Sequence, residues 1–549
     1  MTPTTIGALL PLFSGLPLLV GGLLVTTGQR LRLHAIVNIC TMLVMLVSAF
    51  GLVYHFWSND GGAIAHQVGP WPPGVAIPFA ADMFTALMLS VTLLLTVVSI
   101  WFAQASRAAN SRYFAPLILI LTAGVNGALL TADLFNLFVF LEVMLLPSYG
   151  LYVLSANRKL PLRRVHGARL YVTMNLFTST LYMIGVGFLY GTAGTVNIGV
   201  LADQAQDDPT VAIAGAVSIF ALSIKASVVP IHGWLARAYP GTSPAITALF
   251  SGLHTKVAIY AIYRIYAVVY GGDTRFLWIG VLFFSLTMLI GVFGAVGEKT
   301  TRTILAFHMV SQIGYILLGV ALFTELGLTA GIFYLLHHMI VKASLFMSTG
   351  AVEVRYGTGV IGALGGISRT EPIIAVAFMI AALSLAGIPP FSGFAAKFML
   401  IVGAVESGQI AAVITMLFVS LITLLSMLKI WTGMFWEKGS GGPATKSGTL
   451  ITSHTRDPYA HEASYTPELA TEATRAQVST LTSTQTIIEA DESTVPARRI
   501  NFSLAAPSVV LALITICLGL GAQFLLALTG IAAEGLYDTT QYVQAVLSP

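Results

Sequence analysis

The segment LFNLFVFLEVMLLPSYGLYVL (residues 134–154) is predominantly apolar and carries a single carboxylate, Glu142, near its middle. A helix of this length crosses a hydrocarbon core of about 30 Å. A charged group at the centre of a bilayer costs at least a few kcal/mol, so such residues usually mark a path for ions or protons. The segment therefore predicts a membrane-spanning helix in a protein that moves charge.

Apolar runs of the same kind recur along all 549 residues, of which 56% are hydrophobic and only 9% charged. The mean hydropathy is +0.85, whereas a soluble domain holds roughly a quarter charged residues. The composition predicts an all-α polytopic membrane protein with about fourteen transmembrane helices. We expect them near residues 6–26, 34–55, 79–104, 114–131, 134–153, 168–190, 211–239, 242–270, 276–296, 302–325, 328–351, 373–404, 411–435 and 503–530. The first run has no basic residue before it and no cleavage site after it, which favours a retained helix over a signal peptide.

Basic residues alternate between the loops, which predicts the orientation of the chain. Those that follow odd-numbered spans are Arg30, Arg32, Arg107, Arg112, Arg158, Lys159, Arg163, Arg164, Arg169, Arg237, Lys299, Arg302, Arg355 and Arg369. The other loops carry almost none, Arg264 and Arg275 being the exceptions. Because basic loops face the cytoplasm, we expect a multi-pass protein of the cell membrane with both termini outside.

Residues 437–500 differ from the rest of the chain, being rich in Ser, Thr, Ala and Glu without a sustained period. We expect a largely disordered cytoplasmic loop, with a small folded module as the alternative. The expected organisation is three N-terminal helices in 1–110, a first repeat in 111–272, a second repeat in 273–408 that runs to the start of helix 13, helix 13 itself in 409–436, the loop, and a last helix with its tail in 501–549.

Two of the expected spans contain helix breakers beside a lysine. Pro230 interrupts the segment LSIKASVVPIHGWLARAYPG, residues 222–241, and Pro389 with Pro390 interrupts LSLAGIPPFSGFAAKFML, residues 383–400. Proline removes a backbone donor, which a membrane tolerates only where protein or a wet cavity satisfies the freed groups. The breaks lie five spans apart, an odd offset, so they predict two inverted five-helix repeats with broken helices 7 and 12.

Glu142 is the only acidic residue that we place in a helix interior, and a buried carboxylate should be protonated or paired with a cation. Lys225, near the first break, is the natural partner. One interpretation is that Lys225 switches between Glu142 and a second partner as protons move. The other is a static salt bridge between two helices, which is by itself a poor source of stability.

Further charged and imidazole groups lie in later spans. Lys256 is too deep to reach either surface easily, and His254, two residues before it, lies on another face. His338 and Lys342 are four residues apart and share a helical face, so they could extend a proton relay; the alternative is hydrogen bonding to a polar neighbour. His337 is a weaker candidate on the adjacent face.

Lys397 follows the second break and resembles Lys225 in the other half, so we expect it to be the terminal proton carrier. Lysines in apolar sites become usable as reversible proton sites. Lys429 is expected to extend to the cytoplasmic surface. His232 is expected to cap the broken helix. His308, near a helix end, is expected to be structural, with a place in the lining of an entry path as the alternative.

Other kinds of chemistry find no support in the sequence. It contains no phosphate-binding loop, dinucleotide fingerprint, clustered Cys or His ligands, or haem-binding pattern. Cys40 and Cys517 are far apart and indicate neither a disulfide nor a metal site. The net charge of +4 comes from short loops and helix interiors and does not indicate nucleic-acid binding. We therefore expect an ion transporter rather than an enzyme, without a cofactor or bound metal.

The motifs together resemble the proton-translocating antiporter family, which includes the antiporter-like subunits of respiratory complex I and the large subunits of Mrp-type cation/proton antiporters. The resemblance rests on residues 134–154, the run IKASVVPIHGWLARAYPGTSPAITALFSGLHTKVAIYAIYR, AFHMVSQIGYILLG, HHMIVKASLFM and LAGIPPFSGFAAKF. Within the family, HGWLARAYPGTSPAITALFSGLHTK is most similar to the Mrp-type sodium/proton antiporters.

The resemblance implies roles for individual residues and a hetero-oligomer with other subunits. It carries the family's key glutamate onto Glu142, the lysines of the two broken helices onto Lys225 and Lys397, the bridging lysine onto Lys256, and the positions of the eleventh helix onto His338 and Lys342. The substrates would be sodium ions and protons, exchanged across the lipid bilayer. Two departures are the long 437–500 segment and His254, where an apolar residue is more usual.

Two alternatives remain open from the sequence. One is a proton-pumping subunit of a redox complex, such as complex I or a membrane-bound hydrogenase. The other is a scaffold subunit whose buried charges are vestigial.

Overall fold

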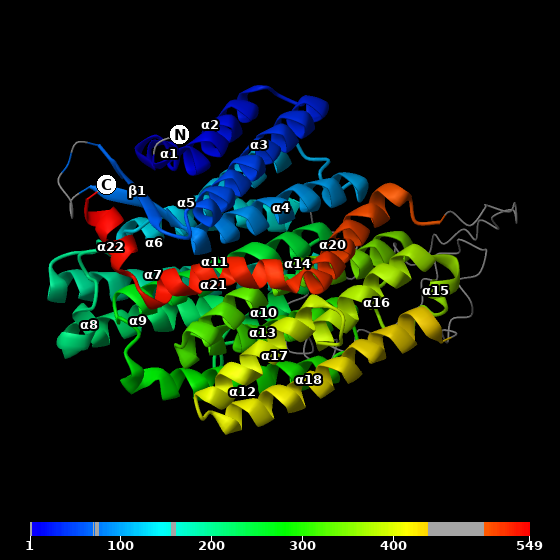
Figure 1. The fold of residues 1–549 in the computed structure, drawn as a ribbon. Helices are drawn as coiled ribbons and strands as arrows, with labels where there is room; N and C mark the ends of the chain where they lie inside the picture. Colours follow the sequence, from blue (N-terminus) through cyan, green and yellow to red (C-terminus); the bar gives the residue numbers. More distant parts are fainter. Residues whose placement is uncertain (1–2, 70, 72–75, 155–160, 438–498, 549) are drawn as a thin grey trace, which may run out of the picture.

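A computed structural model describes residues 3–69, 71, 76–154, 161–437 and 499–548. Long helices lie side by side in one bundle, and the two chain termini lie at the same end of it (Figure 1). Most of the expected polar loop, residues 438–498, lies outside the described residues, as do Arg158 and Lys159. Within the described part, twelve helices are long and apolar enough to cross a membrane and three shorter ones are apolar. The all-α polytopic fold is therefore confirmed, and the number of about fourteen spans stays a prediction.

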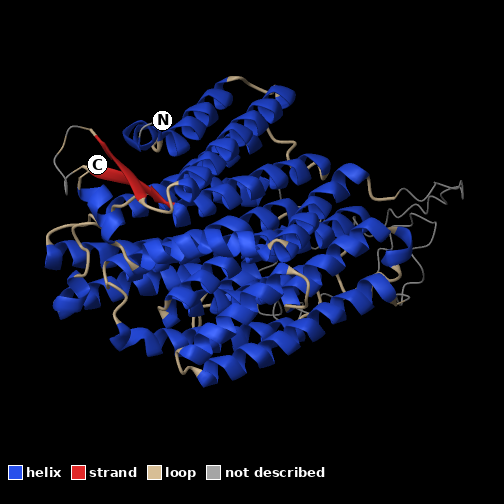
Figure 2. Cartoon of the chain, in the orientation of Figure 1, coloured by secondary structure: helices blue, strands red, loops and turns tan. Residues whose placement is uncertain are grey.

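The N-terminal part contains an element that was not expected. Its helices are α1 (Pro3–Leu9), α2 (Leu12–Thr26), α3 (Leu31–Ser58) and α4 (Met83–Ala105). Between α3 and α4, the strands β1 (Ala63–Val68) and β2 (Ile77–Asp82) form an antiparallel hairpin (Figure 2). The predicted helix start at residue 79 is wrong because Asp82 is extended and caps α4, its Oδ1 accepting from the Thr85 amide at 2.9 Å.

Two series of five helices follow, as the repeat prediction requires. The first comprises α5 (Phe114–Leu130), α6 (Leu134–Leu154), α7 (Pro161–Ala193), the broken pair α9 (Pro209–Ala226) and α10 (Gly233–Ala238), and α11 (Pro244–Val268), with the short α8 (Gln204–Asp207) and η1 (Tyr239–Gly241) in its connections. The second comprises α12 (Leu277–Gly297), α13 (Thr301–Leu322), α14 (Glu325–Tyr356), the broken pair α16 (Pro372–Ala386) and α17 (Ser392–Glu406), and α18 (Ile410–Ile430). The short elements η2 (Thr274–Phe276) and the π-helical η3 (Trp431–Trp436) flank it, and α15 (Ile367–Thr370) lies between α14 and α16.

The C-terminal part differs from the single helix expected over residues 503–530. It forms α20 (Phe502–Leu520) and α21 (Ala522–Tyr537), which meet at Gly521, and then α22 (Thr540–Leu547). Both α20 and α21 pack against α14, and α22 packs against the hairpin. Because α20 and α21 both pack against α14, this break lets one apolar segment cover α14 with two helices.

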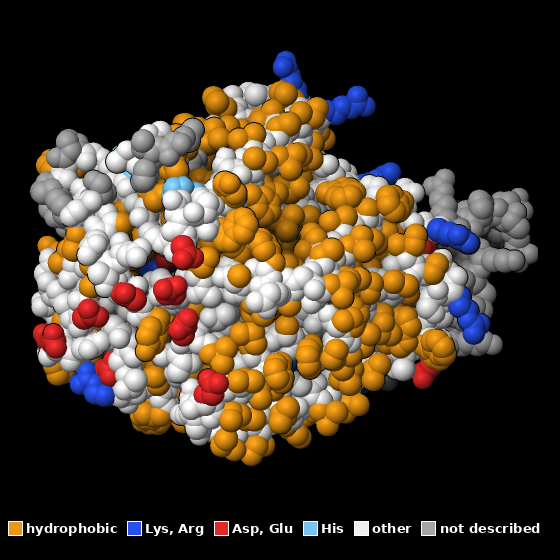
Figure 3. Space-filling view, in the orientation of Figure 1, with side chains coloured by type: hydrophobic (Ala, Val, Ile, Leu, Met, Phe, Trp, Pro, Cys, Tyr) orange, Lys and Arg blue, Asp and Glu red, His pale blue; other side chains and the backbone are white. Residues whose placement is uncertain are grey.

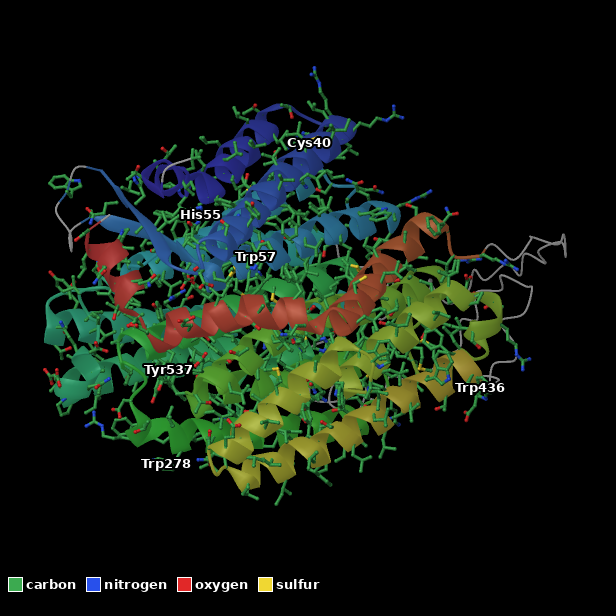
Figure 4. The ribbon with its side chains drawn as sticks, viewed as in Figure 1. Cys40, His55, Trp57, Trp278, Trp436 and Tyr537 are labelled. Atoms are coloured by element: carbon green, nitrogen blue, oxygen red, sulfur yellow. The ribbon has the colours of Figure 1, made fainter. Side chains whose placement is uncertain are left out.

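Burial divides the helices into a centre and a periphery. In α11 and α14, 100% of the residues in the most apolar 18-residue stretch are buried. The same share is only 28% in α12 and 33% in α2, α3 and α18. Apolar side chains cover the middle of the visible face, with most acidic side chains at one end and most basic ones at the other (Figure 3). Exposed aromatic residues also mark both ends, with Trp278 and Tyr537 at one and Trp436 at the other (Figure 4). Such a distribution is typical of a protein embedded in a bilayer.

Candidate functional site

The two helix breaks have the same local construction. Helix α9 ends at Ser227 with φ 68°, and α16 ends at Gly387 with φ 90°; both residues are left-handed C-caps. The prolines follow three residues after each cap, at Pro230 and Pro390, each in a cis bond. Pro389 directly precedes the second of them. The broken helices predicted from sequence are thus present, each in the fourth member of its series.

The lysines lie on opposite sides of these breaks, which corrects the simple equivalence that the sequence indicated. Lys225 is in the last turn of α9, before the break, whereas Lys397 is in α17, after it. Lys397 nevertheless reaches back, and its Nζ donates to the Ala386 carbonyl at 3.1 Å. Both lysines therefore belong to the C-terminal end of a half-helix, where the helix dipole favours a cation.

Glu142 and Lys225 do not form the predicted ion pair. Among the described residues the three ion pairs are Arg264–Asp82, Arg275–Asp273 and Arg302–Glu353. Lys225 instead donates to Asn175 Oδ1 at 3.2 Å, and Glu142 Oε1 is buried without a hydrogen-bond partner. The two charges still interact electrostatically, so Lys225 lies near Glu142 while a neutral amide from α7 holds its amine.

His254 joins a chain of hydroxyl groups beside Lys225. Its Nδ1 is 2.7 Å from Tyr171 Oη, which also donates to Ser148 Oγ at 3.0 Å. All three residues are buried, and His254 Nε2 has no partner. The charge of Lys225 acts on this imidazole. The hydroxyl groups of Ser148 and Tyr171 therefore connect α6, on the C-terminal side of Glu142, to His254 of α11.

The centre of the site lies between α11 and α14. Lys256 is fully buried and donates only to Thr255 Oγ1, at 3.1 Å. His338 is fully buried with neither ring nitrogen hydrogen-bonded, and both Lys256 and Lys342 act on it electrostatically. Lys342 Nζ donates to the Leu305 carbonyl of α13 at 3.0 Å. His338 and Lys342 therefore share a face, as their spacing predicted.

The second break gathers a further group of polar side chains. Besides Ala386, Lys397 Nζ contacts Ser420 Oγ at 3.2 Å and lies 4.9 Å from the centre of the Tyr315 ring. His337 Nδ1 is 2.8 Å from Ser392 Oγ, at the start of α17, and the charge of Lys397 acts on its ring. His337 thus belongs to the surroundings of Lys397 rather than to those of Lys342.

His308 is the residue that sequence reasoning undervalued. It is fully buried, its Nε2 is 2.9 Å from Ser426 Oγ, and the charges of both Lys342 and Lys397 act on it. It lies about two turns into α13, as Glu142 lies about two turns into α6, and these are the second helices of their series. The internal repeat could have identified His308 from the sequence, because His308 has in the second repeat the position that Glu142 has in the first.

The remaining candidates have local roles. Lys429 Nζ donates to the carbonyls of Val296 and Glu298, each at 2.8 Å, where α12 ends. It is therefore a capping residue rather than a side chain that extends freely into solvent. His232 occupies the N-cap position of α10, but its side chain makes no capping hydrogen bond. In the part of the chain that the structure describes, no group of three or more His, Cys, Asp or Glu is placed to hold a metal ion.

The predicted residues lie near enough to one another to interact electrostatically, and we term this set the polar series. Its members, in spatial order, are Glu142, Lys225, His254, Lys256, His338, Lys342, His308, Lys397 and His337. Neighbours along it interact electrostatically, apart from His254 and Lys256, which are two residues apart on α11. The series includes residues of both repeats, and its centre lies on α11 and α14, the most deeply buried helices.

Comparison with known proteins identifies the family. Residues 131–423 match the family described as "NADH:quinone oxidoreductase/Mrp antiporter, TM". The chain belongs to this family. Every member of the polar series lies within the matched region.

Individual relatives agree with this assignment and with the resemblance to Mrp-type sodium/proton antiporters. The chain is 37% identical to the D-type Na(+)/H(+) antiporter subunit of Alkalihalophilus pseudofirmus over 77% of this chain and 85% of the relative. It is 29% identical to the protein of the same name from Bacillus subtilis over 97% and 98%. A polypeptide in the structure of the Mrp complex from Dietzia sp. DQ12-45-1b is 54% identical and superposes with a TM-score of 0.88, covering 99% of this chain and 100% of that one.

Proposed function

We propose that the protein is a subunit of a multi-subunit sodium/proton antiporter and that it conducts protons through the polar series. The observation that carries the proposal is the succession of buried amines and imidazoles that begins beside Glu142 and extends to Lys397. The names of the relatives support the substrates and the partners, which would be sodium ions, protons and the other subunits of an Mrp-type complex.

The chemistry of the series suits reversible protonation. Within it, buried atoms without a hydrogen-bond partner are Glu142 Oε1, His254 Nε2, His308 Nδ1, His337 Nε2 and both ring nitrogens of His338. Buried polar atoms that lack a protein partner usually bond to water, and imidazole can both accept and donate a proton. Each protonation changes the field on the next group, so the sites would titrate as coupled neighbours.

The state of Lys225 is central to this mechanism. A neutral amide at 3.2 Å holds its amine, so the protonated form is not locked by a carboxylate and its charge acts on Glu142 and His254 alike. Movement of the amine toward Glu142 would stabilise the charged form, and movement away would release the proton toward α11. The break after Lys225 supplies the local freedom for such a movement.

For the orientation, we propose that the chain is inserted in the cell membrane with both termini outside and the 437–500 segment in the cytoplasm. The distribution of charge supports this, because basic residues favour the cytoplasmic side and the acidic end of the bundle is the end that carries the termini (Figure 3).

The alternative within the same family is a proton pump that a redox partner drives. The 54% identity to a component of an Mrp complex favours the antiporter. A test is to express the whole gene cluster in an antiporter-deficient host and to measure cation-induced pH changes in inverted vesicles. We expect sodium to dissipate the pH gradient with the wild-type protein but not with Glu142→Ala or Lys225→Ala. If sodium has no effect and a redox substrate drives proton uptake, the antiporter proposal is wrong; if both assembled variants stay active, the protein is a scaffold.

A further inference from the structure

A buried ion pair lies outside the polar series, at the end of the bundle that carries the termini. Arg264 Nη2 of α11 is 2.7 Å from Asp82 Oδ2, and the two side chains are only 3% and 6% exposed. Arg264 Nε and Nη1 have no hydrogen-bond partner although they are buried. A buried ion pair contributes little net stability, and one with two buried nitrogens that lack partners contributes less. The pair therefore calls for an explanation other than stability.

Hydroxyl groups extend from this pair toward the polar series. Asp82 Oδ1 accepts from Thr85 Oγ1 at 2.9 Å, and Thr85 Oγ1 is 2.7 Å from Tyr260 Oη. Lys256, Tyr260 and Arg264 are spaced by four residues on α11, so they lie on one face with a rise of about 6 Å per step. A single helical face thus leads from the centre of the polar series to the ion pair.

Asp82, the acidic partner of the ion pair, lines a cavity that opens at this end, and Arg264 lies behind it. The cavity holds about 70 Å³ and is lined by Asp82 and Tyr542 together with Asp60, Glu534, Asp538 and Gln541, which is room for several water molecules. The Tyr542 ring lies 4.2 Å from the Arg264 guanidinium carbon, so α22 covers the arginine from the cavity side. Figure 3 shows the acidic side chains gathered at this end of the molecule.

We propose that this cavity is the mouth through which the polar series exchanges protons with the water outside the bundle, and that Arg264 and Asp82 form its gate. The inference rests on the proposed proton conduction. A proton that leaves Lys256 crosses the turn of helix to Tyr260 through water. Tyr260 gives its own proton to Thr85, Thr85 gives its own to the Asp82 carboxylate, and Asp82 releases a proton to water in the cavity. Lys256 is then neutral until the polar series protonates it again, and the two hydroxyls rotate back before the next transfer. The acidic rim concentrates cations, while the guanidinium repels sodium from the floor, so only protons continue inward.

The experiment uses the complete complex with Cys40 and Cys517 replaced by serine. Gln541→Cys places a thiol in the cavity, and Gln544→Cys places one on the same helix, outside the cavity lining. Each variant is labelled with a bulky membrane-impermeant maleimide in intact cells and, separately, in inverted vesicles. The transport rate is then compared with that of the same variant untreated. We expect labelling at 541 to remove most of the transport from one face only, and labelling at 544 to leave it unchanged. Full transport after complete labelling at 541, or an equal loss of transport after labelling at 544, would overturn the proposal that the cavity is the mouth of the polar series.

A second measurement tests the gate itself. In Arg264→Gln complexes that co-purify normally, we expect loss of most sodium-dependent proton exchange, with partial recovery in Arg264→Lys, which keeps the charge. If assembled Arg264→Gln complexes exchange protons at the wild-type rate, the proposal that Arg264 and Asp82 form a gate is wrong. These outcomes can be told apart from failure of the proposed function. If the proposed function is wrong, the wild type shows no sodium-dependent exchange. If only the gate is wrong, the wild type still exchanges protons and Glu142→Ala still abolishes the exchange.

Discussion

The amine of Lys397 lies 3.1 Å from the carbonyl oxygen of Ala386, on the other side of the break between α16 and α17. The chain between them turns at Gly387, whose φ is 90°. A Cβ at this glycine would stand 2.9 Å from Lys397 Cδ. Gly387 therefore allows the backbone to turn and also leaves room for the aliphatic part of the Lys397 side chain.

We predict that Gly387→Ala abolishes most sodium-dependent proton exchange, because the methyl group displaces the Lys397 side chain. A left-handed alanine also costs about 1–2 kcal/mol. Gly408→Ala is the matched control, since Gly408 also has a positive φ, 71°, but open space around its Cα. Vesicle transport and thermal unfolding of the purified complex separate the effects: both variants lose stability, and only Gly387→Ala loses transport. Equal transport in the two would contradict the positioning of Lys397 by Gly387.

Asn175 is predicted to control the mobility of the Lys225 amine. Asn175→Asp puts a carboxylate within about 3.2 Å of Nζ, and a buried ion pair at this distance is several times stronger than the amide contact. We expect the amine to be fixed, so that transport falls at least about tenfold, the factor that 1.4 kcal/mol of extra holding energy produces. Asn175→Ala should have a smaller effect. If Asn175→Asp transports like the wild type in vesicles, Lys225 does not need to leave this partner.

Lys429 is predicted to matter for stability and not for transport. Its amine caps the end of α12 through two carbonyls at 2.8 Å, so Lys429→Ala should lower the free energy of unfolding by about 1 kcal/mol. Lys397→Ala should instead abolish transport. The two lysines are compared by assembly, unfolding and vesicle transport. Loss of transport in an assembled Lys429→Ala complex would place this lysine on the proton path after all.

Acid is predicted to loosen α22. Hydrogen bonds from the Thr540 side chain and backbone hold the pKa of Asp538 below its ordinary value of 3.8, and the Thr540 amide is 3.0 Å from Asp538 Oδ1. A lowered pKa means that the carboxylate stabilises the fold above pH 3.8, and that this contribution is lost as the pH falls through the lowered pKa. Hydrogen-exchange protection of α22, corrected for the intrinsic rate, should drop over that range. In Asp538→Ala the drop should be absent.

The sequence predicted the elements whose signal is local. Apolar runs located most of the spans, the prolines located both breaks, and a charge within an apolar run singled out Glu142, Lys225, Lys256 and Lys397, whose shared path stays a prediction. These features depend on the chain within a few residues, and hydropathy or proline chemistry reports them directly.

The contacts between distant elements were not predictable in the same way. Asp82 and Arg264 are far apart in sequence, and the carboxylate lies in a hairpin that reads as the start of an apolar helix. His308 looked like a helix-end residue until the second repeat placed it between two lysines. The expected contact of Glu142 with Lys225 is absent because the Lys225 amine donates to the Asn175 side chain of α7 instead. Pairing depends on packing between helices, which periodicity does not encode.

The packing of α20, α21 and α22 against α14, α4 and the hairpin has a consequence for biosynthesis. These three helices emerge from the ribosome after every other described element, yet Tyr542 is the residue that covers Arg264. Until α22 has been translated, Arg264 lacks the packing that Tyr542 provides in the folded protein. We expect ribosome-stalled chains that end before residue 502 to be retained by membrane chaperones or degraded, so that the last helices act as a checkpoint on the first.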